Sequence, residues 1–158
     1  MPIAVGSKAP DFTLKTKTAS GFEDVTLSSN FGSRASVLLF VPAAFSGTCT
    51  TELCDVSAGL ASYSDLGAAV YGISVDSPFA LEAWSRQAGI SFPLLSDYSH
   101  EVCRAYGVEL ADFLGIGRSA ARAAFVIDKG GVVRHAEQTP TPGDLPNFEA
   151  VKAALKNV

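Results

Sequence analysis

The chain has 158 residues, of which 47% are apolar and 18% charged, a composition that supplies one hydrophobic core and excludes a disordered chain. Its 12 basic and 16 acidic residues give a formal net charge of −4, and no segment concentrates lysine and arginine, which argues against nucleic acid as a main partner. We expect residues 1–158 to form a single domain.

Strand patterns alternate with helical patterns along the chain. Continuous apolar runs predict strands that are covered on both faces, and the Lys-Gly-Gly turn at 129–131 predicts a hairpin between the last two. The predicted strands are Ser36–Val41, Ala69–Val75, Phe92–Leu95, Ala123–Asp128 and Val132–Gln138. The predicted helices are Thr48 to about Leu66, Pro78–Ala88, Ser99–Tyr106 and Asn147–Lys156.

The order of these elements predicts the fold class. Alternating strands and helices, followed by a hairpin and a terminal helix, indicate an α/β fold with a central mixed sheet flanked by helices. This order is compatible with a thioredoxin-like fold. A flavodoxin-like sheet is the alternative, but it is disfavoured because no Gly-rich phosphate loop follows a strand.

No segment predicts export or membrane insertion. The longest apolar run, Val37–Phe45, contains Pro42 and is too short to span a bilayer, and no basic segment followed by an apolar one opens the chain. The three cysteines, Cys49, Cys54 and Cys103, are too few for a disulfide scaffold. We therefore expect a cytoplasmic protein without membrane contact, whose thiols are catalytic, redox-sensing, metal-binding or buried.

The most informative segment is Val41–Cys54, VPAAFSGTCTTELC. A strand ends there at Pro42, and a helix begins near Cys49, which shares one helical face with Leu53 and Val56. We expect Cys49 on the face that packs on the sheet, at its solvent-facing edge. Free backbone N–H groups and the helix dipole favour a thiolate at this position and can lower a thiol pKa from about 8.5 to about 3.5–7.5. A buried, inert cysteine is the alternative.

The run Pro42-x-x-x-Ser46-x-x-Cys49 resembles the peroxiredoxin active-site motif Pro-x-x-x-Thr/Ser-x-x-Cys, whose cysteine is the peroxidatic nucleophile. ARAAFVIDKGGVVRH, which contains Arg122, resembles the arginine-containing strand and hairpin of that family, and GSKAPDFTL and FPLLSDYSHEVCRAYGV match other segments of it. The resemblance covers nearly the whole chain. It looks closest to the alkyl hydroperoxide reductase E type, with features of the bacterioferritin comigratory (Q) type.

The resemblance implies a thiol-dependent peroxidase that reduces hydrogen peroxide and small organic hydroperoxides through a cysteine sulfenic acid. In that role Arg122 stabilises the thiolate and donates hydrogen bonds to the peroxide. Ser46 supplies a hydroxyl, and Pro42 shapes the loop and shields the sulfur. Glu52 either orients an arginine or is a solvated acid in the first turn of the helix.

The resemblance also implies how the sulfenic acid is resolved, because Q-type members carry their resolving cysteine where Cys54 stands. An intact helix separates the Cα atoms of Cys49 and Cys54 by about 8.6 Å, whereas a disulfide needs at most about 7 Å, so the first turns must unwind. The alternative for this step is a buried Cys54 with resolution by an external thiol, as in the E type. The alternative to a peroxidase is a non-catalytic redox sensor on the same scaffold, with Cys49 as its switch. Cys103 is expected in the core.

The expected partners are a hydroperoxide and a reductant, which is a thioredoxin-like protein, a glutaredoxin-like protein or a low-molecular-weight thiol. We expect a homodimer. His100 and His135 have no Cys/His spacing suited to zinc, so neither a metal nor another cofactor is expected. No Cys-x-x-Cys motif is present, which disfavours a disulfide reductase.

Overall fold

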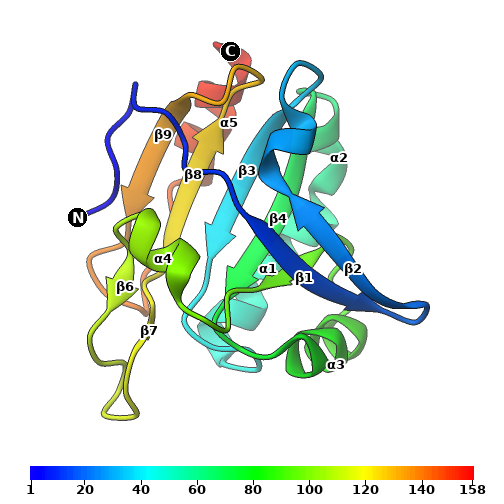
Figure 1. Ribbon diagram of the computed structural model, residues 1–158, viewed down its shortest axis with the longest axis vertical. Coiled ribbons are helices and arrows are strands. Elements are labelled where there is room, and N and C mark those ends of the chain that lie inside the picture. The colour runs from blue at the N-terminus through cyan, green and yellow to red at the C-terminus, as the bar shows by residue number, and fades with distance from the viewer.

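The computed structural model describes residues 1–158. Its centre is a seven-stranded mixed sheet, with helices on both faces (Figure 1). The strand order is β2-β1-β5-β4-β3-β8-β9, with β3, β4 and β5 parallel and the other neighbours antiparallel. The strands are β1 (Thr13–Thr18), β2 (Gly21–Thr26), β3 (Ala35–Phe40), β4 (Ala68–Ser74), β5 (Leu94–Ser96), β8 (Ala123–Ile127) and β9 (Val133–Gln138). A separate two-stranded pair joins β6 (Glu109–Leu110) to β7 (Ser119–Ala120).

The helices divide between the two faces of the sheet and bury a separate apolar cluster on each. Side chains of α1, α2, α3 and α5 share one cluster, and side chains of α4 and the N-terminal segment share the other. The helices are η1 (Leu27–Asn30), α1 (Gly47–Ala58), α2 (Leu60–Ser64), α3 (Pro78–Ala88), α4 (Glu101–Ala105) and α5 (Phe148–Lys156). None of them is long and apolar enough to cross a membrane.

The position of β3 at the centre of the sheet explains why its sequence is continuously apolar. Val37 and Leu39 point into one cluster, whereas Leu38 and Phe40 point into the other, and all four are fully buried. A strand covered on both faces needs apolar side chains at every position. The chain leaves β3 at Phe40 and enters α1 at Gly47, so the connecting loop lies at the carboxyl end of the parallel strands.

The predicted mixed sheet is confirmed, as are its five predicted strands and the hairpin of β8 and β9. The prediction of one helix from Thr48 to about Leu66 is wrong. The helix ends at Ala58 because Gly59, a poor helix former, bends the chain, and α2 begins after it. The hairpin of β1 and β2 was not predicted, because the sequences TLKTKT and GFEDVT are largely polar; β2 forms the edge of the sheet, and β1 lies between β2 and β5.

Candidate active site

The loop between β3 and α1 is held on both sides by side chains from distant parts of the chain. Ser119 Oγ donates a hydrogen bond of 2.5 Å to the carbonyl of Pro42, which is buried. The Ala44 N–H donates to Asp76 Oδ2 at 2.8 Å, and Ser74 Oγ donates to the same oxygen at 2.7 Å. Sequence reasoning missed Asp76, although its position just after β4 is where functional residues of parallel sheets gather. No sequence signal marks Ser119.

Cys49 lies in the first turn of α1. Ser46 is the N-cap residue, and the Thr50 N–H donates to the Ser46 carbonyl at 2.9 Å. Helix geometry leaves the backbone N–H groups before Thr50 without helical partners, so they remain free to face an anion. The expectation that Cys49 sits at a solvent-facing edge is wrong, since its exposed fraction is 0%. The buried side chains of Arg122 and Glu52 enclose this end of the helix.

Arg122 is 2% exposed and connects the parts of the site. Its Nη2 donates to Cys49 Sγ at 3.2 Å, and its Nη1 donates to Glu52 Oε2 at 2.5 Å. Its Nε and Nη2 both donate to the carbonyl of Pro142, at 2.9 and 2.8 Å. The planar guanidinium is therefore fixed on three sides, which a single ammonium group could not reproduce. The sequence left open whether Glu52 orients an arginine or is a solvated acid. In the structure Glu52 is buried, and its carboxylate forms an ion pair with Arg122.

The electrostatics of the site depend on how Glu52 and Arg122 share charge. Burial raises the pKa of Glu52 from 4.5 to about 7, and the charge of Arg122 offsets only part of this effect. Glu52 Oε1 is buried without a hydrogen-bond partner, which also disfavours the carboxylate anion. Burial acts to lower the pKa of Arg122, but the negative charges of Cys49 and Glu52 hold it above its usual value.

Glu52→Gln is expected to remove a pH dependence of stability. Because burial raises the folded-state pKa of Glu52, the contribution of this residue to the free energy of unfolding should be fully present below pH 4.5 and be lost as pH rises from 4.5 to about 7. The neutral glutamine should abolish this decrease. Urea unfolding at a series of pH values measures it, with the exposed Glu23→Gln as the control. An unchanged slope in Glu52→Gln would contradict the assignment.

Ser46 and Pro42 flank Cys49 without a hydrogen bond to its sulfur. Ser46 Oγ donates to the carbonyl of Ala43 at 3.0 Å, so its oxygen retains lone pairs that can accept a hydrogen bond. Pro42 directs its carbonyl to Ser119. Among the residues predicted for the site, Cys49 and Arg122 are thus in direct contact, whereas Ser46 and Pro42 belong to the surrounding loop.

Cys54 faces a different neighbour from Cys49. Its Sγ donates to the carbonyl of Ala88 at the end of α3, at 3.4 Å, and it lines a pocket of about 650 Å³ together with Phe45 and Trp84. Cys49 and Cys54 lie in one unbroken helix, and both are free thiols. A bond between them therefore requires α1 to unwind.

Cys103 is fully buried in the core, as the sequence analysis expected. Burial, with the negative charge of Asp97, raises the pKa of its thiol to about 12. Cys103 is therefore a protonated thiol at neutral pH and a poor nucleophile.

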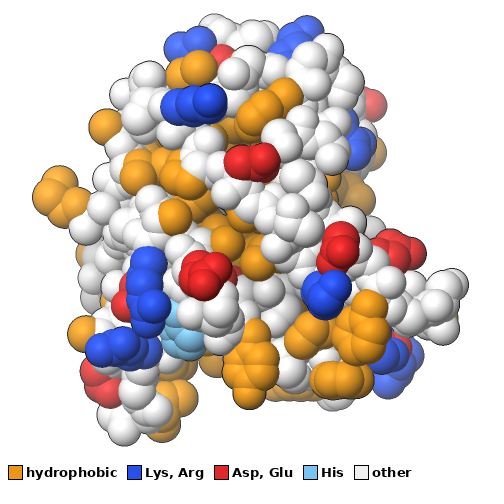
Figure 2. Space-filling model, viewed as in Figure 1, with side chains coloured by type: hydrophobic (Ala, Val, Ile, Leu, Met, Phe, Trp, Pro, Cys, Tyr) orange, Lys and Arg blue, Asp and Glu red, His pale blue; other side chains and the backbone are white.

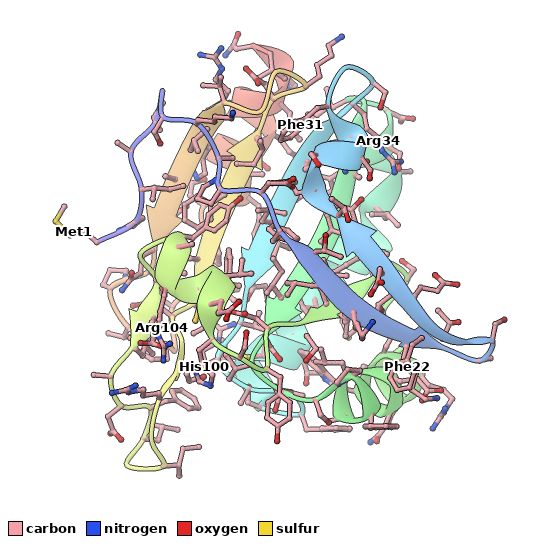
Figure 3. All side chains as sticks on the ribbon, in the orientation of Figure 1. Met1, Phe22, Phe31, Arg34, His100 and Arg104 are labelled. Carbon is pink, nitrogen blue, oxygen red and sulfur yellow. The ribbon has the colours of Figure 1, made fainter.

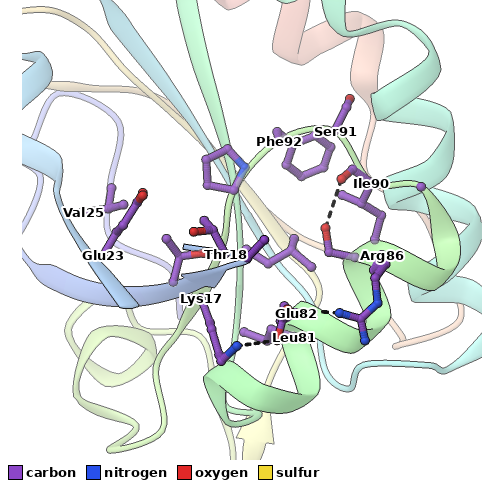
Figure 4. A pocket seen from close by; sticks show the side chains of 16 residues that line it. Lys17, Thr18, Glu23, Val25, Leu81, Glu82, Arg86, Ile90, Ser91 and Phe92 are labelled. Carbon is purple, nitrogen blue, oxygen red and sulfur yellow. Dashed lines mark hydrogen bonds and ion pairs between the residues drawn. The ribbon is translucent and has the colours of Figure 1, made fainter. Parts of the chain in front are cut away.

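A cavity of about 670 Å³ elsewhere in the molecule is not the thiol site. It lies between β1, α3 and β5, and Figure 4 shows Lys17 and Arg86 on either side of Glu82 at its margin. None of the three cysteines lines it. Neither Cys49 nor Arg122 lines this cavity or the one beside Cys54; the two side chains meet in the buried interior.

A buried cysteine in the first turn of a helix, paired with a buried arginine on a mixed α/β sheet, defines a thiol-dependent oxidoreductase site. The AhpC/TSA family model matches residues 5–136. Alkyl hydroperoxide reductase E of Mycobacterium tuberculosis is 38% identical over 143 residues, covering 89% of this chain and 88% of the relative. Peroxiredoxin TSA1 of Saccharomyces cerevisiae is 37% identical, covering all of this chain and 80% of the relative.

The fold agrees with solved structures of the same class. The reduced 2-Cys peroxiredoxin of Plasmodium vivax superposes with a TM-score of 0.86 at 25% sequence identity, covering 98% of this chain and 81% of that protein. The expected thioredoxin-like fold is confirmed. The chain belongs to the AhpC/TSA family of peroxiredoxins and is a thiol-dependent peroxidase.

Proposed function

We propose that this peroxidase, acting as a single domain over residues 1–158, reduces hydrogen peroxide and small organic hydroperoxides at Cys49. The Cys49 thiolate attacks one peroxide oxygen, the O–O bond breaks, and the other oxygen leaves as hydroxide or alkoxide and takes up a proton. Cys49 becomes a sulfenic acid. The substrate is thereby reduced by two electrons and the sulfur is oxidised by two.

The contact of 3.2 Å between Arg122 Nη2 and Cys49 Sγ is the observation that supports this proposal most directly. A guanidinium beside the sulfur stabilises the thiolate and can donate to a peroxide oxygen as negative charge develops there. Glu52 and the Pro142 carbonyl hold the guanidinium in place before the substrate arrives. Ser46 contributes a lone pair toward the peroxide, and Pro42 keeps water from the sulfur.

Stopped-flow fluorescence of Trp84 tests the peroxidase assignment of this site. Trp84 is the chain's one tryptophan, and its Nε1 donates to Thr50 Oγ1 at 3.1 Å, one residue after Cys49. Oxidation of Cys49 should therefore change the emission, with a rate proportional to peroxide concentration. A second-order rate constant no greater than that of free cysteine would instead favour a non-catalytic redox sensor.

We further propose that Cys54 resolves the sulfenic acid. The Cys54 thiol attacks the sulfenic sulfur of Cys49, the disulfide forms, and water leaves. The position of Cys49 in the first turn of α1 supports this route, because the backbone N–H groups before Thr50 have no helical partners and this end of the helix has few hydrogen bonds to break. An external dithiol or two monothiols then reduce the disulfide.

Cys54→Ser should separate oxidation from resolution. The variant should consume one equivalent of peroxide at the wild-type rate, then over-oxidise to sulfinic acid and fail to turn over with a thioredoxin-type reductant. Wild-type protein should lose two hydrogens on oxidation by mass spectrometry, and its far-ultraviolet dichroism should lose helical signal because α1 unwinds. Cys49→Ser, which cannot form the sulfenic acid, is the control.

A single-cysteine mechanism is the second candidate, favoured by the Cys54–Ala88 hydrogen bond, which directs the Cys54 thiol toward α3 in the folded helix. An external low-molecular-weight thiol or a glutaredoxin-like protein would then reduce the sulfenic acid directly. Wild-type turnover by Cys54→Ser, without an internal disulfide in the oxidised wild type, would establish this mechanism and refute resolution by Cys54.

We also propose a cytoplasmic homodimer. The chain has three free thiols and no disulfide, which suits a compartment that keeps cysteine reduced. Exposed apolar side chains supply surface that pairing would bury, and they include Phe22 and Phe79, which stack edge to face at 5.4 Å, and Leu114, which is 80% exposed. Light scattering coupled to size-exclusion chromatography measures the mass; a monomer at all concentrations would refute the dimer.

A further inference from the structure

A second group of potential ligands, remote from Cys49 in sequence, lies where α4 meets β6. A ring nitrogen of His100, the Sγ of Cys103 and a carboxylate oxygen of Glu109 all lie within 4.8 Å of one another. The set supplies nitrogen, sulfur and oxygen, the three donor types that zinc takes from proteins. Figure 3 shows His100 close to Arg104 at this end of the molecule, and a histidine side chain reaches the surface there in Figure 2.

We propose that His100, Cys103 and Glu109 form a binding site for a thiophilic divalent cation, with Zn²⁺ as the best fit. Tetrahedral zinc holds its ligand atoms about 3.3–3.8 Å apart. His100 Nδ1 already lies 3.3 Å from Glu109 Oε2, and the sulfur lies within 4.8 Å of both ligands, so it need approach by no more than about 1.5 Å. Three protein ligands leave one position for water.

The exposed fractions of the three side chains suit a cation that enters from solvent. Cys103 is fully buried, whereas the side chains of His100 and Glu109 remain 22% and 20% exposed, so the outer side of the group is open to water. His100 Nδ1 is itself inaccessible to water and lacks a hydrogen-bond partner of good geometry, although it is close to Glu109. A buried ring nitrogen without a partner is costly, and a metal ion would satisfy it.

The other charged groups around the site act in both directions. Arg104 Nε donates to Glu109 Oε2 at 2.9 Å and competes with a cation, as does the charge of Arg118. Arg104 is 49% exposed, so it can turn into solvent at little cost. The carboxylate of Asp97, which accepts the Cys103 N–H at 2.7 Å, adds negative charge on the inner side. On binding, zinc displaces the thiol proton of Cys103 into solvent and the sulfur binds as thiolate.

Cobalt spectroscopy tests the site without any measurement of peroxidase activity. The host is the Cys49→Ser/Cys54→Ser protein, in which Cys103 is the remaining thiol. We expect Co²⁺ to produce a sulfur-to-cobalt charge-transfer band at one equivalent per chain, and Zn²⁺ to displace it. Absence of the band, or a band that does not saturate at one equivalent of Co²⁺ per chain, overturns the proposal.

Replacing the buried Cys103 itself could unfold the protein. The test therefore substitutes the two partly exposed ligands, His100 and Glu109, in the same host. Glu109→Gln and His100→Asn should each weaken Co²⁺ binding by at least about tenfold. Asparagine tolerates the left-handed backbone of His100, whose φ is 64°. Arg104→Gln should strengthen binding, because it removes the competing guanidinium. Unchanged affinity in both Glu109→Gln and His100→Asn would show that Cys103 binds the metal without this site.

Discussion

Cys49→Ser is expected to reduce peroxide turnover to the rate of the uncatalysed reaction while leaving the fold intact. A serine hydroxyl is not ionised at neutral pH and attacks an O–O bond poorly, whereas it occupies nearly the volume of the thiol. The oxygen can still accept the hydrogen bond that Arg122 Nη2 now donates to Cys49 Sγ. The buried arginine therefore keeps its partners, and little stability should be lost.

The measurement is peroxide consumption with excess dithiothreitol, together with the melting temperature. Cys54→Ser is the matched control, because it removes a thiol from the same helix but should retain the first turnover. If Cys49→Ser still turned over, the nucleophile would be another thiol, and Cys54 is the candidate because Cys103 is buried and protonated. If it failed to fold, the activity loss would be uninformative, so the melting temperature is measured on the same preparation.

Arg122→Lys is expected to lower the second-order rate constant with peroxide by roughly 10²-fold, the typical effect of losing one hydrogen-bond donor to developing charge. Lysine keeps the positive charge. Its single ammonium cannot simultaneously reach Cys49, Glu52 and the Pro142 carbonyl, which the guanidinium does now. The unfolding free energy should also fall, by about 1–3 kcal/mol, because a buried acceptor is left without its donor.

Two readouts separate the roles of Arg122. The thiolate fraction of Cys49 is followed by alkylation with iodoacetamide as a function of pH, and the peroxide rate is measured on the same samples. A rate loss larger than the thiolate loss means that Arg122 also binds the peroxide. If the two losses are equal, Arg122 acts only on the ionisation of the thiol. Arg118→Lys, an exposed arginine, is the control.

Local signals in the sequence predicted most of the sheet but not its edge. Runs such as that of β3 are apolar because both faces are covered, and this pattern is visible without a structure. β1 and β2 carry lysine, threonine and acids; they pair with each other through the backbone, and β1 alone joins them to β5. The break at Gly59 is equally local in origin, but helical spacing continues across it, and the spacing alone predicted one helix.

The contacts of the site depend on segments far apart in the chain. The sequence placed Cys49 at a helix start and identified Arg122 through the family resemblance. It could not determine that Arg122 is clamped by Pro142, or that Ser119 and Asp76 hold the loop, because these pairings span from 20 to 77 residues. His100, Cys103 and Glu109 lie close together in the sequence, but only the folded connection from α4 to β6 brings their ligand atoms within 4.8 Å of one another.

By itself, then, the sequence determined the apolar strands of the sheet and the place of Cys49 at the start of a helix, since strand burial and helix starts are properties of neighbouring residues. Only the tertiary structure decided that Cys49 is buried, not exposed, and that Glu52 is paired with Arg122 and not solvated. Both depend on packing β8 against β3, which brings an arginine 73 residues away onto the sulfur. Desolvation and charge pairing act through space, so the state of a buried ionisable group follows from the fold and not from its neighbours in sequence.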